Sequence, residues 1–528
     1  MEKEPTTNSE DKEEEYLKMA EEFLREIPKD TPRANLVRSL GTIFMTLTCI
    51  DPLAADGFIR DKIKTQFDLK TVEVNDYIKR VRGLAKKFSK KPKSDELSLI
   101  IDRDIKYSEV LHAVSEIGVV PEEMLEIAIA VCVSSVLRLN PPLWLLLVGA
   151  PSSFKTELVN LFGSLSEVYT LDTMTKNAFV SGFVKKDGSD PEDLLPLLND
   201  KCFIVKDLTT IFSLKEDTVK KLLGDLTSIF DGKFEKFTAT RGGVSYSSLF
   251  SMIACITPAI LAKHHSYVNQ LGPRFFFLRV PELTDETRKR GFEIAWSTEN
   301  RSKKVAHARQ LVSSYCAQLM TKVTEGVKTQ ENRPDVRAWL NNAADFVARA
   351  RGIAITKDES FQNKEGKEIE YYDIKDHQVE QPWRALRQLH GYASVLAFMR
   401  GKSSITLEEC RALRPLLIST MQVNRAEIVQ VLITSGGLSA SEIAKRIQKS
   451  AKTIRRSLKE LEVLGLTDAY KRPSITGGVS PWFHFVSEPY ADLLEAQRPS
   501  GDFLSQSKKT SDEDDDFYGL LKEEGPTA

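Results

Sequence analysis

The stretch GAPSSFKT contains residues of the types that hold the phosphates of a nucleotide. In a phosphate-binding loop a glycine precedes a Gly-Lys-Ser/Thr sequence, in which the lysine reaches the β- and γ-phosphates and the hydroxyl binds Mg²⁺. Gly149, Lys155 and Thr156 occupy these places, but Phe154 stands where the second glycine is expected. We therefore predict ATP and Mg²⁺ as ligands, with Thr156 on the metal. The loop residues are Gly149, Ala150, Pro151, Ser152, Ser153, Phe154, Lys155 and Thr156.

A carboxylate that supports the metal is expected at the end of a neighbouring strand. The segment KCFIVKDLTTIF places Asp207 after an apolar run, so Asp207 is the predicted second residue on the metal side. The alternative is an aspartate that caps a helix beginning at TTIF, and one residue can serve both purposes.

The elements that must position these residues follow from the apolar patterns. The run LWLLLV precedes the loop and is typical of a strand buried on both faces. The amphipathic segment TELVNLFGSL follows the loop as a helix. Strand-like runs alternate with helical ones, which indicates an α/β fold with a mainly parallel sheet. The predicted strands are 143–148, 168–171, 202–206, 250–257 and 275–280.

The remaining chain divides by composition and periodicity. The predicted regions are a disordered acidic N-terminus (1–30), a helical N-terminal domain (31–140), the P-loop core (141–284), a second helical region (285–430), a helix-turn-helix unit (431–490) and a disordered acidic tail (491–528). One frayed acidic helix is the alternative for the first of these. The segment KDESFQNKEGKEIEYYDIKDHQ is expected to be a polar, charged insert in the second helical region.

The unit near the C-terminus resembles a winged helix-turn-helix domain. Ser439 or Ser441 is expected to cap a first helix. A second helix begins at Lys452 and ends at Gly465, and a hairpin wing is expected around Gly477. The predicted DNA-binding side chains on the second helix are Lys452, Arg455, Arg456 and Lys459, which would meet phosphates. The alternative is a protein-docking unit of the same fold.

Charge and composition limit the classes of function. The formal net charge is −1, but both ends are acidic, so the residues between them carry a net positive charge. This balance is compatible with a polyanionic partner such as DNA, or with a plain solvated surface. No apolar stretch is long enough to span a membrane. The six cysteines form no CxxC pair, so a zinc ribbon is not expected and a cytoplasmic location fits.

Residues 143–282 resemble the AAA+ core of the minichromosome maintenance (MCM) helicases and their relatives in mobile elements. Those proteins commonly carry GDPGTAKS at the loop, so a residue other than glycine before the lysine has a precedent. The segment SIFDGKFEKFTATRGGVSYSSLFSMIACITP resembles the family's β-hairpin and the strand after it. The resemblance places Thr257 at sensor 1, where it would orient the attacking water. It also implies that Lys233, Lys236 and Arg241 on the hairpin grip DNA in a central pore; a solvated turn is the alternative.

Two arginines receive roles from the same resemblance. LGPRFFFLRVPELTDETRKR places Arg274 at the arginine-finger position, from which it would reach a neighbouring subunit's nucleotide. EQPWRALRQLHGYASVLAFMRGKSSITLEEC resembles the family's helical lid and places Arg384 at sensor 2, with Arg387 as the fallback. The resemblance therefore implies a homo-oligomer, expected to be a hexameric ring. The predicted catalytic residues are Asp207, Thr257, Arg274 and Arg384.

One departure from the family leaves two functions open. The family has Asp-Glu where this chain has Asp207-Leu208, and a leucine cannot polarise water. The first hypothesis is an ATP-dependent, ring-forming DNA helicase or translocase, acting on single-stranded or duplex DNA in the replication of a mobile element, plasmid or phage. The second is a weakly hydrolysing AAA+ scaffold or regulator whose winged helix binds DNA or a protein. The acidic C-terminal tail is either a docking segment for a protein partner or a solubilising tail.

Overall fold

The computed structural model divides the chain into two compact units, residues 1–96 and residues 97–528. The structure describes residues 9–31, 36, 39–47, 50–78, 81, 99–100, 102–175, 177–182, 193–263, 274–297, 299–324, 333–362, 368–471 and 481–498. Among these residues, no helix is long and apolar enough to cross a membrane.

The first unit is built from helices around a small apolar core. Its helices include α1 (Ser9–Arg25), α3 (Gly41–Leu47), α4 (Pro52–Phe58), the π-helix η1 (Ile59–Ile63) and α5 (Lys64–Phe67). Ala20 and Leu24 of α1 are buried in this core, so the helical alternative for the acidic N-terminus holds from Ser9 onward. The helical stretch predicted for 31–140 is divided, because its part after residue 96 belongs to the second unit.

The second unit contains the predicted five-stranded parallel sheet. Its strands are β1 (Trp144–Val148), β2 (Val168–Leu171), β3 (Cys202–Val205), β6 (Ser251–Ile256) and β7 (Phe275–Arg279), in the order β2-β3-β6-β1-β7. All neighbouring pairs in this sheet are parallel. Every residue of β1, β3 and β6 is buried, as expected for strands that helices cover on both faces. The predicted α/β class is confirmed.

Alternating side chains of the strands enter two different cores. Leu145 and Leu147 belong to one core, whereas Trp144, Leu146 and Val148 belong to the other. The first core is continuous with α7 (Tyr107–Ser115), α8 (Glu122–Ser134), α9 (Lys155–Asn160), α16 (Arg301–Thr324), α17 (Pro334–Ala350) and α18 (Trp383–Met399). The second core includes α10 (Leu194–Leu198), α11 (Thr209–Phe212) and α12 (Glu216–Ile229). Helix α8 therefore packs against the sheet in the second unit and not in a separate N-terminal domain.

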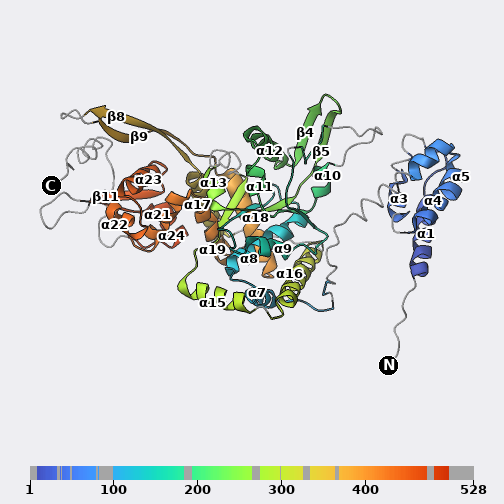
Figure 1. Cartoon of the computed structure of the whole chain (residues 1–528), viewed down its shortest axis with the longest axis horizontal. Coiled ribbons are helices and arrows are strands. Elements are labelled where there is room, and N and C mark those ends of the chain that lie inside the picture. Colours follow the sequence, from blue (N-terminus) through green and yellow to red (C-terminus); the bar gives the residue numbers. More distant parts are fainter. Residues whose placement is uncertain are drawn as a thin grey trace. The chain divides into compact units, whose positions relative to one another are not determined.

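Two antiparallel hairpins complete this part of the unit (Figure 1). The first, β4 (Lys233–Thr238) with β5 (Gly242–Ser247), lies where the resemblance predicted a hairpin. The second, β8 (Ile353–Gln362) with β9 (Glu368–Gln378), falls in the segment predicted to be only a polar insert. That segment is dominated by charged residues, and its alternation of apolar and polar residues is confined to short runs such as EIEY. Its backbone is satisfied by the pairing of its two halves.

The remaining elements surround the core or follow it towards the C-terminus. They are η2 (Ser135–Leu137), α13 (Pro258–Lys263), α15 (Asp285–Trp296), α19 (Leu407–Ala412), α20 (Arg414–Ser419), α21 (Val423–Ile433), β10 (Leu438–Ser439), α22 (Ala440–Arg446), α23 (Ala451–Val463), β11 (Thr467–Lys471), β12 (Trp482–Val486) and α24 (Glu488–Leu494). The last three strands form a sheet in the order β10-β12-β11, beside α22 and α23.

The two helices next to this small sheet begin as the sequence predicts. Ser439 caps α22 in a capping box with Glu442. Helix α23 begins at Ala451, one residue before the predicted start, and Ser450 caps it. Gly465 follows its end with a φ of 70°, a conformation that glycine adopts without strain. The tip predicted around Gly477 lies outside the described residues.

Candidate nucleotide site

The predicted phosphate loop connects the central strand β1 to helix α9. Gly149 donates a hydrogen bond to the carbonyl of Ile256 at 3.2 Å, and Val280 donates to the carbonyl of Val148 at 2.8 Å. The loop therefore leaves the sheet between the ends of β6 and β7. A side chain at Gly149 would clash, because a Cβ atom there would lie 2.6 Å from Ser153 Oγ and 2.7 Å from Val280. The space between Ser153 and Val280 therefore admits only glycine at position 149.

Lys155 is held inside the loop that it is predicted to serve. Its Nζ donates to the carbonyls of Gly149 at 2.8 Å and Ala150 at 2.7 Å, and to Ser153 Oγ at 3.0 Å. The residue is only 7% exposed, and burial lowers the pKa of its amine, against the opposing effects of Cys255 and Asp207. An incoming phosphate can replace neutral acceptors with charged ones, which are better partners for an ammonium group.

Phe154 stands where a glycine is expected, and its ring contacts a neighbouring turn. The residue has a φ of 67°, in the left-handed region, where a residue with a side chain costs about 1–2 kcal/mol. Its ring lies against Gly118 in the turn between α7 and α8, where an added Cβ atom would fall 2.1 Å from the ring. Apolar packing against this turn compensates for the strained backbone. Phe154 therefore ties the loop to the segment before β1.

Asp207 and Leu208 follow β3 and face different surroundings. Asp207 is exposed, and its Oδ1 accepts a hydrogen bond from the amide of Thr209, the first residue of α11, at 2.8 Å, whereas Leu208 occupies the N-cap position of this helix. The next residue, Leu208, donates to the carbonyl of Cys255 at 2.8 Å near the end of β6, which places Asp207 on the loop side. Leu208 is 6% exposed and belongs to the second core. Position 208 therefore points into the protein, where a carboxylate would have no access to water.

Thr257 lies at the same end of the sheet as the loop. It directly follows β6, whose last residue, Ile256, accepts the hydrogen bond from Gly149. Its side chain is partly exposed. Lys155, Thr156, Asp207 and Thr257 are thus all found at the carboxyl ends of three adjacent strands, where parallel α/β sheets commonly bind ligands.

Arg274 and Arg384 lie at the other end of the sheet. Arg274 immediately precedes β7, and Phe275 pairs with Trp144 at the start of β1. A strand of five residues separates this end from the loop, which corresponds to about 16 Å. The Arg274 guanidinium lies 6.0 Å from the Phe230 ring centre, and that of Arg384 lies 5.9 Å from the same centre. The two arginines, distant in sequence, therefore share one aromatic neighbour.

The Arg274 side chain is also partly withdrawn from solvent. Its Nε donates to the Thr227 carbonyl at 3.1 Å, and burial together with the charge of Arg384 lowers its pKa. Arg387, the fallback for sensor 2, is exposed and lies one turn further along α18. An arginine side chain cannot cross the length of a strand, so neither Arg274 nor Arg384 reaches the phosphate loop of its own chain.

The basic residues predicted on the hairpin have partners within the chain. Arg241 is buried against Asp193, and it also donates to Tyr246 at 3.1 Å. The hydrogen bond to Asp193 raises the Arg241 pKa. Lys236 donates to the Val180 carbonyl at 3.2 Å and lies 3.6 Å from Asp225.

Lys233 is exposed but forms an ion pair with Glu235 at 2.8 Å. The most exposed apolar side chain of the hairpin is Phe237, at 81%. In this structure Arg241 and Lys236 therefore anchor the hairpin.

The basic side chains on α23 are arranged as the periodicity predicted. Ile454, Leu458 and Leu461 are buried, whereas Lys452, Arg455 and Arg456 are exposed on the other side. Lys459 is partly exposed, and Arg456 lies 4.0 Å from Glu460 of the same helix.

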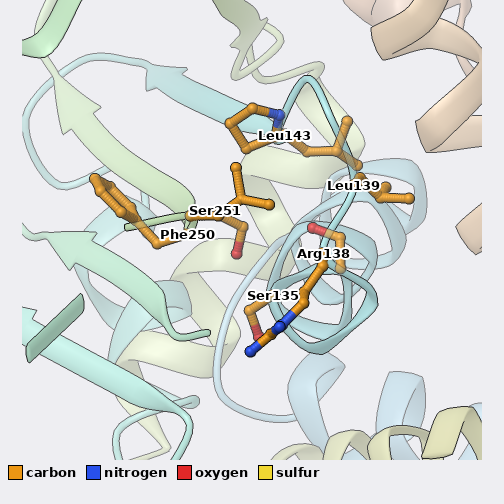
Figure 2. Close-up of a pocket in the computed structure, with 9 residues that line it drawn as sticks. Ser135, Arg138, Leu139, Leu143, Phe250 and Ser251 are labelled. Carbon is orange, nitrogen blue, oxygen red and sulfur yellow. The ribbon is translucent and has the colours of Figure 1, made fainter. Parts of the chain in front are cut away.

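A small pocket at the amino ends of β1 and β6 is unrelated to these residues (Figure 2). Ser135, Arg138, Leu143 and Ser251 are among its lining residues. It offers about 10 Å³ to water-sized spheres, which is room for about one water molecule. It does not accommodate a nucleotide.

Sequence reasoning missed two residues next to the candidate site. The Phe154 ring packs against Gly118. The only sign of this contact in the sequence was a glycine between two helical segments, in IGVVP. Lys206, which precedes Asp207, pairs with Asp172 at the end of β2 at 3.0 Å. The charges on both residues were visible in the sequence, but their pairing depends on the neighbouring strands β2 and β3.

Comparisons with known proteins find no matching family model and no curated protein of similar sequence. Several solved structures are similar. A predicted ATPase from Cytophaga hutchinsonii is 13% identical with a TM-score of 0.35, and the match covers 67% of this chain and 93% of that one. A full-length MCM homolog from Methanopyrus kandleri is 14% identical with a TM-score of 0.36, with 60% of each chain covered.

A structure described as the NrS-1 C-terminal region is 11% identical with a TM-score of 0.27, over 75% of this chain and 79% of that one. These TM-scores are low, so the proposals below rest on the residues of this chain.

Proposed function

We propose that this protein is an AAA+ ATPase whose nucleotide site is shared between neighbouring copies, and that it works on DNA as a ring-forming helicase or translocase. The observation that carries the proposal is the separation of two sets of residues. The loop, Lys155 and Asp207 lie at the carboxyl ends of the strands, and Arg274 and Arg384 lie at the amino ends. A second copy that presents its arginine end to the loop of the first would complete the site.

The residues at the loop suit ATP with Mg²⁺. Lys155 would exchange its carbonyl partners for phosphate oxygens, and the loop amides would surround the phosphates. The exposed hydroxyl of Thr156 and the carboxylate of Asp207 are oxygen ligands of the kind that Mg²⁺ prefers. Bound Mg²⁺ would neutralise charge on the phosphates. Thr257 would orient water, and Arg274 of the next copy would stabilise charge at the γ-phosphate.

The action on DNA is supported by the C-terminal module. Two helices beside a three-stranded antiparallel sheet fit a winged helix-turn-helix, and the exposed basic side of α23 suits a phosphate backbone. Because such contacts are electrostatic, DNA affinity should fall steeply with salt. Arg455→Ala should weaken binding to all sequences alike and should reduce the salt slope by about one unit.

The second candidate is an ATP-dependent scaffold with little turnover. This candidate is favoured by Leu208. The residue after Asp207 is a buried leucine and not a carboxylate, so it cannot polarise water at the loop. In this case ATP would assemble the copies, and the C-terminal module would recruit DNA or a protein.

ATP hydrolysis measured with and without single-stranded DNA separates the two candidates. The first predicts turnover that DNA stimulates and that Lys155→Ala abolishes. Lys220→Ala, an exposed lysine on α12 that pairs with Glu216, is the matched control and should retain activity. Binding of ATP with no turnover in either condition would reject the first candidate and support the second.

A further inference from the structure

Helix α15 carries large aromatic residues on a side that the described residues leave uncovered. Among the described residues, which include all of α15, no side chain of this helix is buried. Phe292 is 61% exposed and Trp296 is 84% exposed. The two are four positions apart, so they lie on one side of the helix. Phe292 and Trp296 are called the α15 patch below.

The helix is attached beside the phosphate loop by its other side. The chain enters α15 soon after Val280, which is hydrogen-bonded to Val148 at the loop end of β1. Gly291 faces Val119, because a Cβ atom there would lie 3.7 Å from that side chain. Arg290 donates to the Ser115 carbonyl at 3.3 Å. Helix α15 therefore lies beside the end of α7 and the turn that holds the Phe154 ring (Figure 1), and it leaves its aromatic patch uncovered.

A large exposed aromatic residue also lies at the arginine end of the sheet. Trp383 begins α18 and is 64% exposed. It directly precedes Arg384, whose guanidinium lies beside Arg274 over Phe230. Each end of the sheet therefore combines half of the candidate site with an uncovered aromatic surface. Burial of aromatic side chains is a large contribution to association, and Trp is enriched where interfaces are strongest.

We propose that the α15 patch is the docking surface for a second copy of this chain, which inserts Trp383 at the start of its α18. This proposal rests on the proposed function, because it assumes that the arginines complete a neighbouring copy's site. A second copy is the occupant because a contact between its Trp383 and the α15 patch does two things. It covers the aromatic residues at both ends, and it brings Arg384 and Arg274 to the edge that carries the loop. The contact is heterologous, so repeated copies form a ring or a filament.

The first experiment measures assembly with the full chain. In sedimentation velocity with ATP and Mg²⁺, Trp296→Asp should shift the protein from oligomer to monomer, with assembly weakened at least about tenfold. Val72→Asp is the matched control, since Val72 is 73% exposed and lies in the first unit, and it should assemble like the unchanged protein. An unchanged mass for Trp296→Asp would overturn the proposal.

Two further measurements keep the result interpretable. Thermal unfolding of Trp296→Asp should match that of the unchanged protein, because the side chain is exposed. Binding of a fluorescent ATP analogue should also be retained, since the phosphate loop lies in the same chain. If the unchanged protein bound no nucleotide, the proposed function would fail. The assembly result would still decide the docking proposal.

A cross-linking experiment tests the geometry directly. Phe292→Cys and Trp383→Cys are made in separate chains, mixed, and treated with a short bis-maleimide. A cross-linked dimer should form in the mixture and should be absent from either variant alone. The described native cysteines, Cys132, Cys202, Cys255, Cys316 and Cys410, are buried, and the unchanged protein serves as the blank. A dimer from Phe292→Cys alone, or none from the mixture, would overturn the proposed pairing.

Discussion

At the carboxyl ends of its strands the five-stranded sheet carries a loop, a lysine and a carboxylate, whereas at the amino ends it carries two arginines beside one aromatic ring. The first group lies on one strand-to-helix connection and its neighbours. The second is assembled from β7, α12 and α18. Because a strand separates the groups, we propose that each is half of a catalytic arrangement. On this proposal, a pair of copies is the unit that hydrolyses ATP.

The largest expected effect comes from removing the arginine end while leaving the loop intact. Arg274→Ala should reduce ATP hydrolysis by about 1,000-fold, which is the lower range for a residue that stabilises charge on the γ-phosphate from a neighbour. Nucleotide affinity should change little, because the loop binds the phosphates. Steady-state hydrolysis and equilibrium binding of an ATP analogue measure the two quantities separately. Equal losses in both would mean that Arg274 supports the fold of the sheet and not the reaction.

Helix α18 offers a matched pair of arginines for the same question. Arg384 lies beside Arg274, whereas Arg387 is exposed one turn away. Arg384→Ala should therefore lower hydrolysis about 100-fold, in the range for one positioned charge-stabilising group. Arg387→Ala should leave the rate within about twofold, as expected for an exposed residue off the site. The reverse pattern would assign sensor 2 to Arg387.

At the loop end, Leu208 tests whether a missing catalytic carboxylate can be restored. Leu208→Glu should not accelerate hydrolysis, because the side chain points into the second core. An unpaired buried charge should instead lower the free energy of unfolding by about 3–5 kcal/mol, measurable by urea denaturation. Leu214→Glu is the control, since Leu214 is 39% exposed. Faster hydrolysis by a stably folded Leu208→Glu protein would show that position 208 faces the nucleotide.

The smallest expected effect concerns the tie between the loop and the α7–α8 turn. Gly118→Ala should weaken nucleotide binding, because the added methyl group displaces the Phe154 ring and with it the loop. In a Phe154→Gly background the same substitution should have little effect. The double-mutant cycle should give a coupling free energy of about 1–2 kcal/mol in ATP-analogue binding. Additive effects would mean that the ring contact does not influence the loop.

Most of the sheet could be predicted from the sequence, because runs such as LWLLLV and CFIV are buried on both faces and leave a strong apolar signal. The hairpin of β8 and β9 could not, because its residues are polar and its strands are stabilised mainly by each other. The loop was recognisable from Gly149, Lys155 and Thr156, because these residues are close together in the sequence.

The arrangement of the arginines was beyond the sequence alone. Arg274 and Arg384 meet over Phe230 only because α12 and α18 converge at one end of β7. The inward direction of Leu208 likewise depends on which face of the sheet the second core covers. The ion pair of Arg241 could not be predicted either, because its partner Asp193 is distant in sequence.

The central claim, that two copies share one nucleotide site, is tested most directly by mixing two inactive variants. Lys155→Ala lacks a working loop but keeps its arginines, and Arg274→Ala keeps the loop but lacks the arginine. In a mixed assembly, an Arg274→Ala loop can receive Arg274 from a Lys155→Ala neighbour. We predict that the mixture hydrolyses ATP at a rate well above that of either variant alone. A mixture as inactive as its components, under conditions in which the unchanged protein is active and the variants assemble together, would contradict the shared site.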